Sequence, residues 1–142
     1  MKLNLIIPIA FFSCLFVCQT FALTKDGRDE ILSQLDISIK KSGYVNACGN
    51  AVVPDINRID LDKFGRKLFF QVVVEDSKCY GASNSEISLF LSEENGFHLV
   101  LNSSGKMINV MPTQHKGMFD IQVLGAGIAP PAVWQWDGIQ YR

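Results

Sequence analysis

The sequence has few of the features that identify the common functional classes of protein. Its 142 residues carry a formal net charge of −1, so it has no excess of basic residues to attract nucleic acid. Its two histidines and four cysteines are too scattered to form a zinc-ligand pattern. The G-x-S-x-G motif of serine hydrolases is absent, and we find no repeat or low-complexity tract. The composition is typical of one globular domain, and the sequence carries no obvious catalytic motif.

The N-terminal stretch matches a secretory signal peptide. A positive start at Met1-Lys2 precedes the apolar run Leu5–Val17, which is too short to span a membrane. Thr20 and Ala22 occupy the −3 and −1 positions of a cleavage site. We therefore predict a signal peptide over residues 1–22, a single α+β domain over residues 23–142, and a periplasmic location for the exported protein.

The cysteines then divide into two pairs. Cys14 and Cys18 leave with the signal peptide, unless one of them carries lipid, and the residues before them fit a lipoprotein signal poorly. Cys48 and Cys79 remain, and a pair of cysteines in an exported protein predicts a disulfide. The loop that it closes would contribute about 3 to 4 kcal/mol of stability. Two free buried thiols are the alternative.

One amphipathic helix is predicted at the start of the domain. Asp26 is a plausible N-cap, and Ile31, Leu35 and Ile39 recur every four residues. Gly43 follows as a natural C-terminal stop. The apolar face should pack on a sheet. A membrane-surface helix is the alternative, but the polar face is mixed rather than basic.

Roughly seven strands follow, joined by short turns. The run Leu68–Val74 is almost continuously apolar, which predicts a central strand covered on both faces. Connections this short require mostly antiparallel pairing. The other predicted strands are 56–61, 87–92, 97–101, 107–111, 119–124 and a last one around Trp134. The predicted fold is α+β: an N-terminal helix packed on a bent, mostly antiparallel sheet of about six to seven strands, with one disulfide.

The segment from Asp60 to Gly65 resembles the start of a calcium loop. Phe64 stands where an oxygen ligand is needed, and Gln71 stands where a bidentate Glu is expected. Two carboxylates are too few for calcium, so the segment favours a β-turn with Gly65 at positive φ. We predict no metal and no cofactor.

The candidate catalytic groups do not form a recognisable set. His98 and His115 are the two histidines, and Glu75, Asp76 or Asp120 could supply paired carboxylates. A nucleophile, a base and an orienting group must converge in space, which spacing alone does not indicate. We therefore assign no catalytic residue and predict a protein that is not an enzyme. A hydrolase that uses His115 or carboxylates such as Asp120 remains the alternative.

The last stretch is rich in aromatic residues. Trp134 and Trp136 are two residues apart and share a face of any strand, and Asp137-Gly138 predicts a hairpin with Tyr141 on its return. With Phe119 these tryptophans could form a binding platform. Aromatics at strand spacing are more typical of a core.

Two loops are candidates for a contact surface, 113–117 and 126–131. They lie at opposite ends of the predicted strand 119–124, so at most one of them is expected to be the site. The first is favoured for its polar side chains, Gln114, His115 and Lys116.

Several short motifs lie along the C-terminal two thirds of the chain. They are Asp60-Leu61-Asp62 with Gly65, Cys79-Tyr80-Gly81, Met111-Pro112-Thr113, Gly117, Asp120-Ile121 with Val123, Gly125 with Gly127, and Trp134 and Trp136 with Gly138 and Tyr141. Together they resemble a group of small exported bacterial proteins, mostly of uncharacterised function. The first of these motifs is similar to the calcium-binding strand of FG-GAP-type repeats, from which Phe64 departs. The resemblance implies the fold and export, and supplies no catalytic residue.

A small, disulfide-bonded, exported scaffold with loops and no visible active site suggests a protein that binds another protein. We predict a periplasmic inhibitor or immunity protein that acts on a cell-wall hydrolase or a secreted toxin. An envelope-assembly or surface accessory protein is one alternative, and a small hydrolase is another. We predict no nucleic-acid partner and no membrane span, and the oligomeric state stays open.

Overall fold

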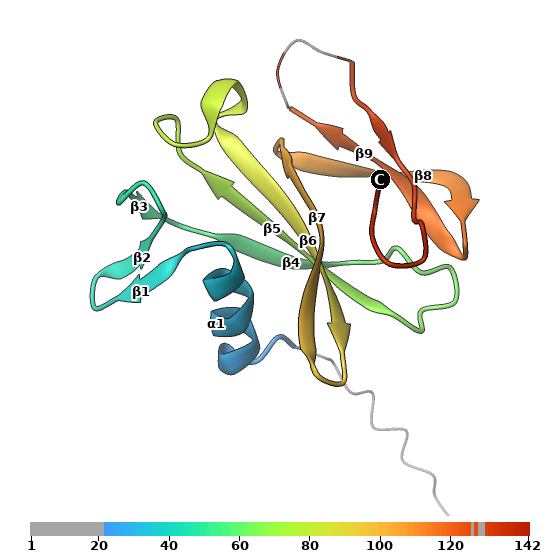
Figure 1. The fold of residues 1–142 in the computed structure, drawn as a ribbon, viewed down its shortest axis with the longest axis horizontal. Coiled ribbons are helices and arrows are strands. Elements are labelled where there is room, and N and C mark those ends of the chain that lie inside the picture. Colours follow the sequence, from blue (N-terminus) through green and yellow to red (C-terminus); the bar gives the residue numbers. More distant parts are fainter. Residues whose placement is uncertain (1–21, 126, 128–129) are drawn as a thin grey trace, which may run out of the picture.

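The structure is a computed structural model that describes residues 22–125, 127 and 130–142. These residues form ten strands, one α-helix and one short 3-10 helix (Figure 1). The strands make three antiparallel sheets, in the orders β1-β2-β3, β4-β5-β6-β7 and β10-β9-β8. The elements are α1 (Lys25–Gln34), β1 (Ser38–Lys40), β2 (Gly43–Val45), β3 (Ala51–Val52), β4 (Asp55–Ile59), β5 (Leu68–Glu75), the 3-10 helix (Gly81–Ser83), β6 (Ser85–Glu93), β7 (Gly96–Ser104), β8 (Met107–His115), β9 (Met118–Leu124) and β10 (Val133–Trp134).

Strand β5 separates two hydrophobic cores. Phe70 and Val72 belong to a cluster that includes Ile31 and Leu32 of α1. Phe69 is completely buried in the other cluster, with residues of β6, β7 and the β8–β9 hairpin. Burying a side chain of this size contributes roughly 1.5 to 3 kcal/mol. The predicted central strand, apolar on both faces, is therefore confirmed.

The helix begins two residues earlier than its predicted N-cap, Asp26, would place it. Thr24, not Asp26, caps it, because the Thr24 hydroxyl accepts a hydrogen bond from the Gly27 N–H at 3.1 Å. Gly27 also lets the helix approach β7, since a Cβ there would lie only 2.9 Å from a ring carbon of Phe97. Ile31 faces the core and is fully buried.

The predicted C-terminal end of the helix is wrong. Helix α1 ends at Gln34, and Asp36 adopts a left-handed conformation with φ of 55°. Ile39 lies in β1, pairs with Tyr44 of β2, and is 53% exposed. The sequence also alternates Ile37 and Ile39 at strand spacing, and β-branched residues favour a strand over a last helical turn.

Strand β8 continues beyond its predicted end at Pro112. It reaches His115, and its pairing with β9 shifts register between Val110 and Gln114. Proline has no N–H for the ladder, so it is tolerated where the pairing is irregular. The turn itself is Lys116-Gly117, and both residues have positive φ, 49° and 84°, as a tight two-residue hairpin requires.

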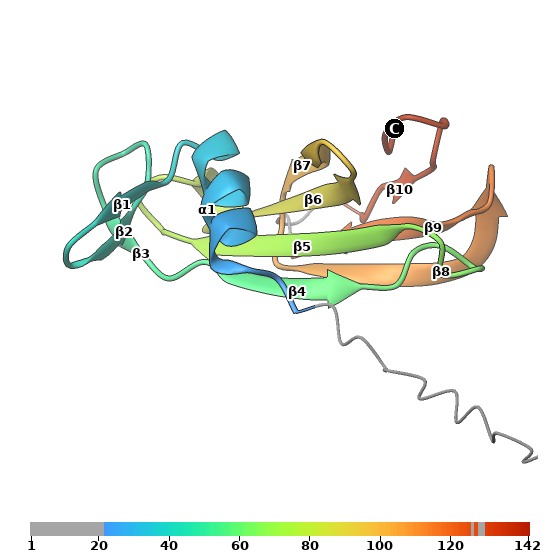
Figure 2. The same cartoon turned by 90° about the horizontal axis from the view of Figure 1, so that it is seen from below.

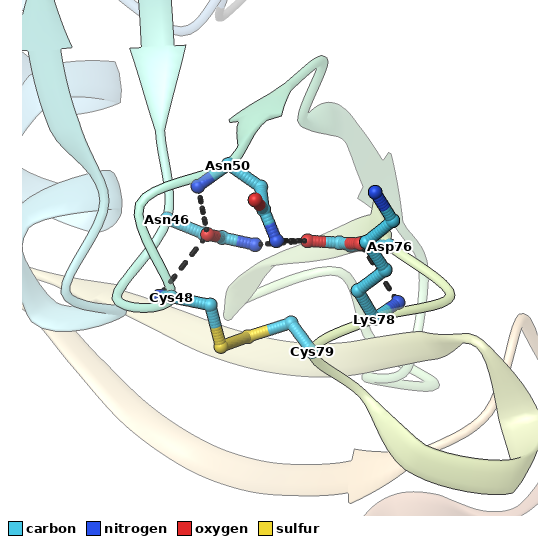
Figure 3. Close-up of a disulfide and its surroundings, with 6 residues drawn as sticks. All are labelled: Asn46, Cys48, Asn50, Asp76, Lys78 and Cys79. Carbon is cyan, nitrogen blue, oxygen red and sulfur yellow. Dashed lines mark hydrogen bonds between the residues drawn. A yellow bond between two sulfur atoms is a disulfide. The ribbon is translucent and has the colours of Figure 1, made fainter.

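The predicted disulfide is present. Cys48 and Cys79 are joined, with their Cα atoms 6.0 Å apart (Figure 3). The bond links the β2–β3 loop to the loop between β5 and the 3-10 helix. It therefore ties the small β1-β2-β3 sheet, which lies toward one end of the molecule together with α1, to the central sheet (Figure 2).

Asp76 reinforces this link beside the disulfide. Its Oδ2 accepts hydrogen bonds from the side-chain amides of Asn46 and Asn50, both at 2.8 Å, and its Oδ1 accepts one from the Lys78 N–H at 2.9 Å (Figure 3). The Lys78 N–H and then the two amides favour the charged carboxylate and lower the pKa of Asp76.

The predicted fold class holds only in outline. The helix, the antiparallel strands and the disulfide are present, but a single sheet of six to seven strands is wrong. The described residues form ten strands in three sheets, and the fold is mostly β. The second large sheet exists because the central sheet is apolar on both faces, and α1 covers only one of them.

Candidate functional site

The three residues predicted as a contact surface lie together at the β8–β9 hairpin. Gln114 and His115 end β8, and Lys116 begins the turn. All three are exposed. The loop predicted here is therefore a strand end followed by a tight turn, which gives its side chains defined directions. The second candidate loop, 126–131, lies partly outside the described residues.

A buried carboxylate anchors the end of this hairpin, residues 113–118, which is named here the β8–β9 tip. Asp120 of β9 is only 2% exposed, and its Oδ1 lies 2.7 Å from Nδ1 of His115. Its Oδ2 accepts a hydrogen bond from the Thr113 hydroxyl at 2.6 Å. A carboxylate only accepts hydrogen bonds, so we assign the proton of His115 to Nδ1. The imidazole, 46% exposed, is thereby fixed in orientation and tautomer.

Strand geometry explains why these three side chains meet. Thr113 and His115 are two residues apart on β8 and share one face of the hairpin. His115 pairs with Met118, and Asp120 is two residues beyond Met118 on β9. Paired residues also share a face, so the carboxylate emerges beside both β8 side chains.

Tyr141 packs next to this group. Its hydroxyl donates a hydrogen bond to the Phe119 carbonyl at 2.9 Å. Burial, and to a lesser extent the negative charge of Asp120, raises the pKa of Tyr141, so the phenol stays neutral at physiological pH. The ring also packs edge-on against Trp136, with centroids 5.3 Å apart. Trp136 is 4% exposed and belongs to the core, so it is not part of an exposed aromatic platform.

The β4–β5 loop runs beside the start of β9. Asp62 forms an isolated bridge with Met118, and the Phe119 N–H donates to the Leu61 carbonyl at 2.9 Å. The buried Asp62 carboxylate accepts three backbone N–H bonds, from Phe64, Arg66 and Lys67, at 2.9 to 3.1 Å. The segment that resembled a calcium loop is therefore a turn closed by one carboxylate, with Gly65 at a φ of 65°.

The C-terminal turn also contacts the tip. Lys116 donates through Nζ to the Asp137 carbonyl at 2.5 Å. The Asp137 carboxylate accepts from the N–H groups of Gln140 and Ile139, which lower its pKa. Trp136 and Tyr141 form a bridge across this turn.

The remaining candidate residues make their contacts elsewhere. Glu75 pairs with Lys106 at 3.6 Å, and Asp76 belongs to the disulfide region. His98 lies 3.1 Å from both Glu93 and Asn95 in the β6–β7 hairpin. Only Asp120 and His115, among the candidate acids and bases, form one group.

This group contains two parts of a general-base arrangement. A buried carboxylate orients an imidazole, and the other ring nitrogen, Nε2, makes no hydrogen bond with any described residue. No described hydroxyl or thiol is positioned on that nitrogen to serve as a nucleophile. The described residues also contain no group of three or more metal-ligating side chains.

Comparison with known proteins finds no matching family model, and no curated protein or solved structure matches the chain. None of the described helices is long and apolar enough to cross a membrane.

Sequence reasoning missed two features of the site. The first is the pairing of Asp120 with Thr113 and His115, which a T-x-H strand facing an aspartate would have indicated once the hairpin register was known. The second is the exposed ring of Phe64. In the sequence this residue is noted only because it replaces an oxygen ligand in the calcium-loop pattern. In the structure it is 65% exposed, beside two cations.

Proposed function

We propose that this protein is an exported inhibitor or immunity protein that binds a cell-wall hydrolase or a secreted toxin through the β8–β9 tip. The observation that carries the proposal is the construction of the tip. Gln114, His115 and Lys116 are exposed, while the buried carboxylate of Asp120 fixes the hairpin beneath them. A periplasmic location belongs to the same proposal, supported by the signal-like N-terminal sequence and the disulfide.

A preorganised tip suits protein binding because it lowers the entropic cost of association. His115 is held by Asp120, and the Lys116 ammonium is held by the Asp137 carbonyl. The positive φ of Lys116 and Gly117 fixes the backbone of the turn. Side chains that are already ordered lose little freedom on binding, so the contacts they make contribute more to affinity.

Affinity capture tests this proposal. The oxidised protein, purified after export, is immobilised and exposed to envelope and secreted fractions, and the recovered proteins are identified by mass spectrometry. A tip variant, His115→Ala with Lys116→Ala, is run beside a control with Lys40→Ala and Lys41→Ala in the exposed β1–β2 hairpin. We expect wild type and control to recover a cell-wall hydrolase or a toxin, and the tip variant to lose it. Recovery of an envelope component instead would support an accessory role, and equal recovery by all three proteins would remove the tip from the site.

The His115–Asp120 pair favours a small hydrolase as the second candidate function. The pair supplies an oriented base with a free Nε2 that can activate water. Peptidoglycan, ester and peptide substrates are incubated with wild type, His115→Ala and Asp120→Asn. Turnover that disappears in both variants would establish this candidate, and turnover that is absent or unchanged would reject it.

A further inference from the structure

The molecule concentrates exposed positive charge and one exposed aromatic ring where the β4–β5 loop meets the β8–β9 tip. We infer that Lys63, Phe64, Arg66, His115 and Lys116 form one contact surface, named here the cationic face. We infer further that its partner is a folded protein that presents carboxylates in an open cleft. This inference rests on the proposed function and specifies the chemistry of the partner.

The two loops that make the cationic face are held side by side. The Leu61 carbonyl accepts from the Phe119 N–H, and Asp62 bridges to Met118, as described above. A Cβ added to Gly117 would lie 4.0 Å from the guanidinium of Arg66, so the two turns adjoin. Figures 1 and 2 both place the β4–β5 loop and the β8–β9 tip at the same end of the molecule.

Two of the carboxylates close to this face are buried, and a third, that of Asp137, is 29% exposed and pairs with Arg142 at 2.6 Å. The Asp62 side chain is 1% exposed and the Asp120 side chain is 2% exposed. Each is occupied by hydrogen bonds from its own loop or hairpin. The side chain of Arg66, in contrast, is 68% exposed although it lies 3.9 Å from Asp62. Asp60, which is exposed, pairs with Arg58 at 3.2 Å.

Phe64 gives the face an apolar anchor. The guanidinium carbon of Arg66 lies 4.7 Å from the ring centroid, and the ammonium of Lys63 lies 5.9 Å from it. Cation–π contacts of this kind hold an exposed ring in place. An aromatic side chain beside an arginine is also the composition that dominates the binding energy of protein interfaces.

The positive charge and the exposed Phe64 ring together indicate the chemistry of the partner. Lys63, Arg66 and Lys116 complement a surface that carries carboxylates. Enzymes that cleave glycans hold two carboxyl groups about 5 to 9.5 Å apart in a site open to a polymer. A preformed, projecting face of cations around one ring fits such a cleft, with Phe64 in an apolar recess beside the acids.

The first experiment measures binding to purified glycan-cleaving cell-wall hydrolases. Lys63→Glu, Arg66→Glu and Lys116→Glu are combined in one variant. The matched control carries Lys40→Glu, Lys41→Glu and Lys78→Glu, which alter exposed lysines elsewhere and change the net charge equally. We expect the face variant to lose about a hundredfold in affinity or more, Phe64→Ala to lose about tenfold, and the control to bind nearly as wild type. Replacing the catalytic carboxylates of the enzyme by amides should weaken wild-type binding in parallel. Equal losses in the face and control variants would overturn the inference.

A second experiment separates this inference from the proposed function. The ¹⁵N-labelled protein is titrated with poly-L-glutamate, a DNA duplex and anionic phosphatidylglycerol vesicles at the same ionic strength. We expect poly-L-glutamate to shift the amides of residues 63–66 and 115–118, with shifts that shrink as salt is added. That result supports the cationic face even if no hydrolase binds. Shifts spread equally over Lys40 and Lys41, or stronger binding of DNA or vesicles at this face, would contradict it.

Discussion

At the scale of single residues, Asp120 determines the chemistry of the β8–β9 tip. Its buried carboxylate holds the Thr113 hydroxyl and the His115 imidazole with two short hydrogen bonds. Leaving buried polar groups without partners costs more than the bonds themselves contribute. The position therefore links the stability of the hairpin to the orientation of an exposed side chain.

Substituting Asp120→Asn should change the tautomer of His115. Wild-type His115 should carry its proton on Nδ1, whereas an amide that donates to Nδ1 moves the proton to Nε2. Two-dimensional ¹H–¹⁵N spectra of the imidazole rings distinguish these forms. His98, which contacts Glu93 and Asn95 through Nε2, is the internal control and should not change. We also expect a stability loss of about 1 to 3 kcal/mol in urea unfolding. An unchanged His115 tautomer would contradict the assigned hydrogen bond.

Asp76 should make the fold sensitive to acid. Its pKa is lowered in the folded state by the Lys78 N–H and the Asn46 and Asn50 amides. The unfolded chain therefore binds more protons as the pH falls below about 4, and the stability from these bonds is lost through that range. The difference in unfolding free energy between wild type and Asp76→Asn should be largest near neutral pH and shrink in acid.

Urea unfolding, followed by tryptophan fluorescence across this pH range, measures the effect. Asp60→Asn is the control, because the Asp60 side chain is 82% exposed and makes only a surface pair with Arg58. A difference for Asp76→Asn that stays constant from neutral to acid pH would show that the carboxylate charge does not stabilise the disulfide region.

At the scale of elements, Gly105 joins the two large sheets. It lies between β7 and β8 with a φ of 152°, and a Cβ there would fall 2.3 Å from Val123 and 3.0 Å from the Leu124 carbonyl. Gly105→Ala should cost about 2 to 4 kcal/mol, because it adds a clash with β9 to backbone strain. Gly43→Ala, at positive φ but in open space, should cost only about 1 kcal/mol. Thermal unfolding compares the two, and equal losses would mean that the close packing at Gly105 contributes nothing.

Elements with one strong sequence pattern could be predicted from the sequence. Elements whose residues fit both a helix and a strand could not. Strand β5 follows from a long apolar run, and the disulfide follows from the pair of cysteines that remains after the predicted signal peptide. The end of α1 does not, because Ile31, Leu35 and Ile39 fit a helix while Ile37 and Ile39 fit a strand. Pairing with Tyr44 decides between them. Strands of two or three residues, such as β1 and β3, are too short for any periodicity to reveal.

From the sequence, only the consecutive residues of the candidate site could be chosen. Contacts between segments that are distant in the sequence could not be predicted. The tip residues Gln114, His115 and Lys116 follow from a polar loop. The contact of His115 with Asp120 requires the hairpin register, which depends on a turn at Lys116-Gly117 and on the irregular pairing around Pro112. The cationic face requires still more, because the bridge between Asp62 and Met118 joins segments more than 50 positions apart.

At the scale of the whole molecule, the disulfide ties the small sheet to the central sheet. Cys48 and Cys79 are 31 positions apart, and the double substitution to serine should cost about 3 kcal/mol by releasing the unfolded chain. Urea unfolding with and without reductant measures this loss. Reductant should lower the stability of wild type to that of the variant and leave the variant unchanged. Equal stability of oxidised wild type and variant would contradict the expectation.

The disulfide and the proposed binding surface lie at different ends of the molecule. The disulfide and α1 lie toward one end, and the cationic face lies at the opposite end (Figures 1 and 2). The covalent staple can therefore stabilise the scaffold without restricting the surface that meets the partner. Substitutions at the disulfide should reduce stability while a folded protein keeps its affinity.

A titration of cell-wall hydrolysis tests the proposed function most directly. The oxidised protein is added in steps to a panel of purified hydrolases and peptidoglycan-cleaving toxins, and the release of soluble fragments from purified peptidoglycan is recorded. We expect the protein to inhibit at least one enzyme completely at stoichiometric addition, and the variant carrying Lys63→Glu, Arg66→Glu and Lys116→Glu not to inhibit it. Full activity of every enzyme in the presence of an excess of folded protein would contradict the proposed function.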